Sequence, residues 1–201
     1  MKILILTLTA VWFALVFVLG TLGAFLRPPG VPPFPILIGA AGPLIVFAAL
    51  YSGSAAFRES LRTADLRLLT AIQAWRFAGI GFLALCVHGI LPGLFAWPAG
   101  LGDMAIGLTA PWIMLALIRR PSFVSSRWFI AWNLFGMLDL IVALTTGALN
   151  SGFIPALAQK VTTSPMAQMP LVLIPAFFVP LLLMLHMAAL MQAGRAVGRA
   201  G

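Results

Sequence analysis

Residues 95–118 read FAWPAGLGDMAIGLTAPWIMLALI, an apolar run in which Asp103 is the only charged residue. At about 1.5 Å per residue, a helix of this length crosses the roughly 30 Å hydrocarbon core of a lipid bilayer. A charged side chain at the bilayer centre costs about 2.5 to 3.5 kcal/mol on insertion scales, so Asp103 requires a partner, a water path or a proton. The segment therefore predicts a membrane-spanning helix with a polar site inside the membrane.

The composition of the whole chain agrees with this prediction. Hydrophobic residues make up 62% of the 201 residues and charged residues 8%, whereas a water-soluble domain carries about 25% charged residues. Apolar runs bounded by charged residues, Pro and Gly predict spans over residues 3–25, 35–57, 66–90, 95–118, 128–149 and 170–193. Because each crossing needs about 20 apolar residues, we expect a single all-α domain over residues 1–201, a polytopic bundle of six transmembrane helices.

The positions of the cations predict how the bundle is oriented. Nine lysines and arginines fall at the N-terminus, in the second and fourth loops and at the C-terminus, whereas Arg27 and Lys160 fall in loops on the other side. Cytoplasmic loops carry an excess of such residues, so we expect both termini to be cytoplasmic. The net charge of +8 is spread along the membrane edges rather than gathered in one stripe. The expected partner is therefore the lipid bilayer and not a nucleic acid.

Polar side chains within the spans indicate where a functional site lies. The residues that we expect to bind a substrate or ion are Arg76, Asp103, Asp139, Gln73, Asn133 and His186. At about 1.5 Å per residue, Asp103 and Asp139 lie about 12 and 15 Å below the outer surface, almost level with each other. Gln73 and Arg76 share a helix face, and an extended Arg76 side chain reaches the same layer.

Small residues on the face that carries Asp103 indicate that this aspartate points into the bundle. The neighbours of Asp103 on that face are Ala99, Gly100, Gly107 and Ala110. Such a stripe lets two membrane helices approach closely. Our central hypothesis is a cluster of Arg76, Asp103 and Asp139, in which the guanidinium pairs with one carboxylate and the other carboxylate binds a proton or a monovalent cation. Two neighbouring carboxylates in a low dielectric do not readily ionise together.

This cluster predicts a proton- or cation-coupled transporter, or a channel-like protein, for a small solute or ion. One alternative is that the buried pairs only fix helix register and that no solute enters. A second alternative is a non-catalytic subunit or scaffold of a larger membrane complex, in which aromatic and small residues pack against haem, pigment, quinone or further copies of the chain.

An enzymatic function is not expected. Gly100-Leu101-Gly102-Asp103 resembles the GxGD signature of intramembrane aspartyl proteases, with Asp139 as a second carboxylate. In that family, however, the GxGD aspartate follows its partner, whereas Asp103 precedes Asp139. No cofactor or metal is predicted, because Cys/His ligand spacing is absent and His88 and His186 differ by about 20 Å in depth. Ligation of haem by His186 alone stays open.

The pattern of motifs in the third to sixth spans resembles a family of small bacterial inner-membrane proteins. The motifs are Gln73-Ala-Trp-Arg76, Leu91-Pro92-Gly93, Gly102-Asp103 with Gly107 to Pro111, Asn133 with Gly136 and Asp139, and Pro170 through Pro180 to His186. We know of no activity assigned to that family. The resemblance implies a multi-pass protein of the bacterial inner membrane and implies that these polar residues belong together.

Overall fold

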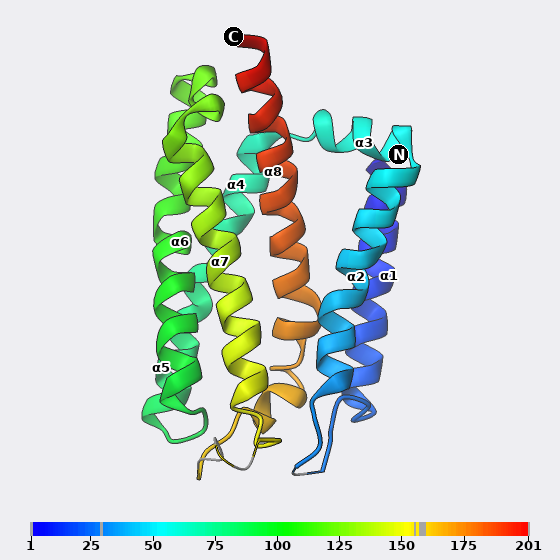
Figure 1. Cartoon of the computed structure of the whole chain (residues 1–201), viewed down its shortest axis with the longest axis vertical. Coiled ribbons are helices and arrows are strands. Elements are labelled where there is room, and N and C mark those ends of the chain that lie inside the picture. Colours follow the sequence, from blue (N-terminus) through cyan, green and yellow to red (C-terminus); the bar gives the residue numbers. More distant parts are fainter. Residues whose placement is uncertain (1, 29, 155, 157–159, 201) are drawn as a thin grey trace.

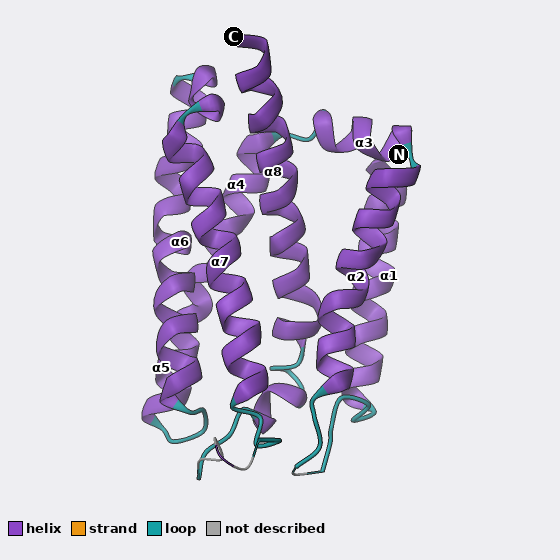
Figure 2. Ribbon diagram, viewed as in Figure 1, coloured by secondary structure: helices purple, strands orange, loops and turns teal. Residues whose placement is uncertain are grey.

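The computed structural model describes residues 2–28, 30–154, 156 and 160–200. These residues form helices joined by loops and turns, and they include no strand (Figure 2). The elements are α1 (Lys2–Thr21), α2 (Phe34–Gly53), α3 (Ala55–Arg62), α4 (Leu66–Ile72), η1 (Gln73–Gly79), α5 (Ile80–Val87), α6 (Gly93–Arg119), η2 (Pro121–Ser125), α7 (Arg127–Leu149), η4 (Ser164–Ala167), η5 (Ile174–Phe178) and α8 (Val179–Ala200).

Six helical segments among the described residues are long and apolar enough to cross a membrane, which confirms the predicted all-α architecture of six spans. They are α1, α2, the continuous run α4–η1–α5, α6, α7 and the run from η5 into α8. The predicted boundaries of the third span were too long, because Gly89, with φ of +69°, turns the chain after α5. Gly23, with φ of +70°, does the same after α1. Positive φ is readily accessible to glycine alone.

The spans form an upright bundle in which α1 and α2 stand as a hairpin beside α8 (Figure 1). The other spans lie on the far side of α8 from this hairpin. Both ends of the chain lie at the same end of the bundle, as an even number of crossings requires. We call this end the terminal end. The opposite end, where residues 22–28, 30–33, 88–92, 150–154 and 160–173 lie, we call the loop end.

The second span ends earlier than the predicted residue 57, because Ser54 separates α2 from a short helix, α3. Ser54 has extended backbone angles, and its hydroxyl accepts a hydrogen bond from the backbone N–H of Phe57 at 3.1 Å. This is the usual chemistry of a helix N-cap. α3 then runs across the terminal end towards α4 (Figure 1). Phe57 is buried in an edge-to-face contact with Phe47 of α2, with ring centroids 5.5 Å apart.

The third span changes from an α-helix to a 3₁₀-helix in its middle, at η1. A 3₁₀ stretch of this length is uncommon, and within a helix it often marks a hinge or a functional site. η1 packs against α6 through glycine: a Cβ atom on Gly107 would overlap the backbone of Arg76 and Phe77. A Cβ atom on Gly79 would likewise overlap Asp103. The predicted small-residue face of α6 therefore lies directly against the segment that carries Arg76.

Candidate functional site

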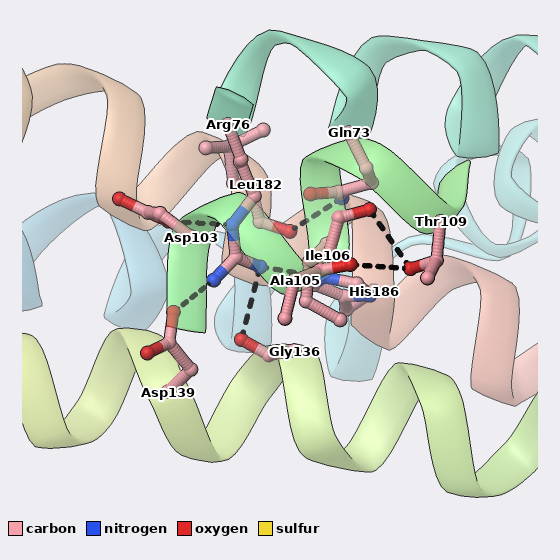
Figure 3. Close-up of polar contacts among 10 residues, drawn as sticks. All are labelled: Gln73, Arg76, Asp103, Ala105, Ile106, Thr109, Gly136, Asp139, Leu182 and His186. Carbon is pink, nitrogen blue, oxygen red and sulfur yellow. Dashed lines mark hydrogen bonds and ion pairs between the residues drawn. The ribbon is translucent and has the colours of Figure 1, made fainter. Parts of the chain in front are cut away.

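Arg76 lies at the centre of a buried polar group between α6, α7 and α8 (Figure 3). Its Nε donates a hydrogen bond to Oδ1 of Asp103 at 2.7 Å, and its Nη2 donates to Oδ2 of Asp139. Nη1 donates to the carbonyl oxygen of Gly136 at 3.1 Å. Arg76 is only 2% exposed. The guanidinium is thus held by three partners from α6 and α7.

Both aspartates pair with the one guanidinium, which corrects the hypothesis that one carboxylate is paired and the other is free. The physical reason is the shape of the arginine head group. It presents five N–H donors in a planar fork, so Nε and Nη2 reach different carboxylates at the same time. The side chain of Asp139 is 6% exposed and that of Asp103 is 14% exposed, so both pairs are shielded.

His186 connects Arg76 to Asn133, and the hydrogen bonds define its tautomer. The amide nitrogen of Asn133 donates to the carbonyl oxygen of Phe129 at 2.8 Å, so the amide oxygen faces Nδ1 of His186 at 2.9 Å. An amide oxygen only accepts, and therefore Nδ1 carries the proton. Nε2 lies 3.1 Å from Nη1 of Arg76, which only donates, and Nε2 therefore accepts. These contacts are satisfied by a neutral imidazole with its proton on Nδ1.

Two glycines make room for the polar group. A Cβ atom on Gly102 would overlap the carboxylate of Asp139, and one on Gly136 would overlap the ring of His186. Gly102 adjoins Asp103 on α6, and Gly136 precedes Asp139 by three residues on α7. The helices come close enough for charged atoms to meet because both positions lack a side chain.

Gln73 and Thr70 extend the polar group towards the terminal end. Nε2 of Gln73 donates to the carbonyl oxygen of Leu182 at 3.3 Å. Oε1 of Gln73 and Oγ1 of Thr70 are buried without a hydrogen-bond partner, and the two residues are 1% and 2% exposed. A buried polar group without a partner costs about 1 to 3 kcal/mol. These two oxygens, three residues apart on one helical run, are therefore candidates to bind water or a cation.

A sequence model of a domain of unknown function, DUF8737, matches residues 33–193, most of the chain. The chain belongs to this family. The match includes Arg76 and all of its polar partners described above, whereas α1 lies outside the matched range. The family has no assigned activity. No curated protein and no solved structure matches the chain.

The structure of this DUF8737 member brings together the six residues predicted to form the site. Hydrogen bonds and ion pairs connect the group Arg76, Asp103, Asp139, His186 and Asn133, which we call the Arg76 network. Gln73 lies one turn before Arg76 and is bonded to α8 through Leu182. Whether these residues bind a substrate or ion stays a prediction.

Sequence reasoning missed some contributors to the site in this DUF8737 member. Thr70 and Trp132 were not predicted, although Thr70 lies three residues before Gln73 and so shares its face. The ring of Trp132 packs edge-to-face on His186 with centroids 5.5 Å apart, and its Nε1 donates to Oγ1 of Thr109 at 2.8 Å. Gly102 was noted only as part of a motif.

The surroundings of the two histidines bear on whether either could ligate haem iron or a metal ion. His88 follows α5 at the loop end and lies outside the Arg76 network. Both ring nitrogens of His186 have partners, so ligation of haem iron by His186 would break its contact with Arg76 or Asn133. Among the residues that the structure describes, no group of three or more His, Cys, Asp or Glu side chains is placed to hold a metal ion.

Proposed function

We propose that the chain is a proton- or cation-coupled transporter of a small solute, with its coupling site in the Arg76 network. The observation that supports this proposal most is the charge of that network. Two carboxylates contact one guanidinium, and the contacts of His186 fit a neutral imidazole. With both carboxylates ionised, one negative charge is left over, and one proton or monovalent cation neutralises it. Because an unbalanced charge inside a membrane is costly, binding of that cation favours a different arrangement of the helices.

The interrupted third span supports the same proposal. Transporters commonly build substrate and ion sites at discontinuous membrane helices near the bilayer midplane. Here η1 separates α4 from α5 and carries both Gln73 and Arg76. A 3₁₀ segment differs from an α-helix in pitch, so η1 is a place where the third span can change conformation.

The unpartnered oxygens of Thr70 and Gln73 suggest one route for the cation. They lie on the terminal side of Arg76 and are deeply buried. Water or a monovalent cation bound there would remove their unfavourable isolation. We infer that the cation moves between the terminal end and the Arg76 network along these oxygens.

We place the terminal end in the cytoplasm and the protein in a bacterial inner membrane. Support comes from the arginines of α3, α4, the α6–α7 connection and α8, which surround the terminal end: Arg58, Arg62, Arg67, Arg119, Arg120, Arg127 and Arg195. Such an excess is typical of the cytoplasmic side. The motif resemblance points to the same membrane.

We propose further that the chain is not an enzyme of the aspartyl-protease type. In such enzymes two carboxylates share a proton and activate a water between them. In this chain the guanidinium of Arg76 contacts both Asp103 and Asp139, which is where that proton and water would bind.

The proposal is tested by transport in proteoliposomes that contain a pH-sensitive dye. A panel of small carboxylic acids, amino acids and sugars is added outside under an imposed membrane potential, and internal acidification or uptake of radioactive sodium is recorded. We expect at least one solute to move protons or sodium with the wild-type chain. Asp139→Asn and Asp103→Asn should abolish this coupled movement while remaining monodisperse in detergent.

The matched control is Glu59→Gln, which removes a carboxylate from an exposed ion pair with Arg62. This variant should transport as the wild type does. Coupled movement that persists in both aspartate variants would overturn the proposal, and so would a wild-type chain that moves neither ion with any solute. The pairs would then only fix helix register.

A further inference from the structure

A cavity of about 290 Å³ lies at the loop end, and no residue of the Arg76 network lines it. It is lined by described residues just before α2, the start of α2, the last turns of α7 and η4, and by single residues of α6 and η5. Much of its wall is apolar and includes Phe25 and Phe95, which are both buried, and Pro175. A concave apolar cavity with a few polar groups is the usual form of a small-molecule site.

The described residues that line this cavity include a positive charge and no negative one. Arg27 is the charged residue among those that line it. The chain has four acidic residues. Asp103 and Asp139 pair with Arg76, while Glu59 and Asp65 belong to α3 and the N-cap of α4 at the terminal end. Among the described residues, Arg27 makes no ion pair with any of them. The cavity therefore favours an anion.

Hydroxyl groups among the lining residues add hydrogen-bonding capacity. Oγ of Ser151 is buried and has no partner, although Ser151 lines the cavity. The hydroxyl of Thr163 is already used, because it donates to the carbonyl oxygen of Gly147 at 2.5 Å and fixes this wall to α7. The hydroxyl of Ser151 thus keeps a donor that no described protein group uses, and a charge-assisted hydrogen bond to an anion would use it.

The cavity lies in line with the buried carboxylate of Asp139. Ala143 and Gly147 line the cavity and follow Asp139 by four and eight residues, so they share its face of α7. At about 1.5 Å per residue, they lie about 6 and 12 Å beyond Asp139 along the helix axis. Ala143 packs against an apolar cluster that includes Phe82, Phe95 and Ala99.

We propose that this cavity binds a small amphiphilic anion, with its carboxylate or phosphate head at Arg27 and Ser151 and its apolar body against Phe25 and Phe95. The ligand is either a free organic acid or the head and upper chain of an anionic lipid. Binding itself does not require transport. The identification of this ligand as the transported solute rests on the proposed function.

The test uses the full chain in a neutral maltoside detergent, with octanoate as the probe. Thermal unfolding is recorded over a concentration series of octanoate, octanol and octylammonium, which differ in head-group charge. A ligand that binds only the folded chain raises the unfolding temperature in a saturable manner. We expect this rise with octanoate alone.

Variants assign the binding to the cavity. Arg27→Gln should weaken octanoate binding about tenfold or more, because a hydrogen bond to a charged group contributes about 1.5 to 3 kcal/mol. Ala148→Leu should weaken it by filling the space beside Gly147. Lys160→Gln is the matched control, since Lys160 is a cation of the same end that does not line the cavity. This control should bind octanoate as the wild type does.

Native mass spectrometry of protein purified without octanoate distinguishes the two sources. An anionic lipid retained by the wild type and lost from Arg27→Gln identifies a lipid, whereas saturable octanoate binding without retained lipid identifies a free acid. Equal stabilisation by octanol or octylammonium, or unchanged octanoate affinity in Arg27→Gln, would overturn the inference. Octanoate that binds but is never transported would leave this site intact and contradict only its identification as the site of the transported solute; the proposed function itself fails only if no solute of the panel moves protons or sodium.

Discussion

Replacement of Arg76 by methionine tests whether the Arg76 network is held together by its single positive charge. Arg76→Met keeps much of the side-chain volume but leaves Asp103 and Asp139 without a counter-charge. Removal of one partner from a buried ion pair costs about 3 to 5 kcal/mol. The carbonyl oxygen of Gly136 also loses its donor, which adds about 1 to 3 kcal/mol if no other donor replaces it. We therefore expect a loss of at least about 3 kcal/mol in the free energy of unfolding.

Three further variants show whether charge is the cause. Asp139→Asn keeps an amide oxygen that can accept from Arg76 and leaves one carboxylate for one guanidinium. It should cost only about 1 to 2 kcal/mol, the difference between a charged and a neutral hydrogen bond. The triple variant Arg76→Met with Asp103→Asn and Asp139→Asn should be more stable than Arg76→Met alone, because no unpaired charge remains. Arg62→Met breaks an exposed pair with Glu59 and should change stability by less than about 0.5 kcal/mol.

The assay is unfolding by sodium dodecyl sulfate in mixed micelles, followed by the loss of helical circular dichroism. All variants are compared at the same detergent ratio, because the apparent stability depends on it. The reasoning fails if Arg76→Met costs no more than Arg62→Met. It also fails if the triple variant is no more stable than Arg76→Met, since the loss would then come from packing rather than from unpaired charge.

Three other predictions concern the packing and hydrogen bonds of the same helices. Gly107→Ala should lower the thermal unfolding midpoint in detergent strongly, because its Cβ overlaps the backbone of Phe77, whereas Gly81→Ala, with nothing near its Cβ, should leave the midpoint unchanged or raise it. Nitrogen NMR of labelled histidine should show His186 as a neutral ring protonated on Nδ1, and Asn133→Leu should shift its signals while those of His88 stay constant. Gln73→Leu should lower the free energy of unfolding in mixed micelles by less than about 1.5 kcal/mol, since it loses one 3.3 Å hydrogen bond but also removes an unpartnered buried oxygen. A larger loss would show that Oε1 has a strongly bound partner.

The arrangement of the spans could be predicted because membrane thickness and helix rise are nearly constant. The predicted spans 95–118 and 128–149 lie within two residues of α6 and α7 at both ends. The constant rise per residue also predicted that Asp103 and Asp139 lie at the same depth, and in the structure both contact Arg76. The convergence of these residues followed from the cost of an isolated charge in a bilayer.

The interruption of the third span could not be predicted, because its cause is not local. η1 contains no proline, and its one glycine, Gly79, is its last residue. The 3₁₀ geometry of η1 goes with its close contact to Gly107 of α6, and this contact depends on how two helices pack. The pairing of Arg76 with both carboxylates was missed for a related reason. The position of a residue along its span gives the depth of its side chain in the membrane. It does not give which atoms of a guanidinium that side chain contacts.

The end of α2 was also misplaced, although a local signal was present. Ser54 precedes a mixed stretch of Arg58, Glu59 and Arg62, and a serine before a charged helical segment is a common helix start. The apolar residues 55–57 concealed it by prolonging the hydrophobic run. α3 shows that hydrophobicity alone does not separate the last turn of a span from the first turn of a helix that lies along the membrane surface.

The ion pair between Arg76 and Asp103 has a consequence for how the chain enters the membrane during synthesis. These residues are 27 positions apart on consecutive spans, whereas Asp139 follows later from the ribosome. The third span has the least hydrophobic window of the six, and its arginine disfavours insertion alone. We therefore expect the translocon to release the third and fourth spans into lipid as a pair, with their opposite charges already matched before the fifth emerges.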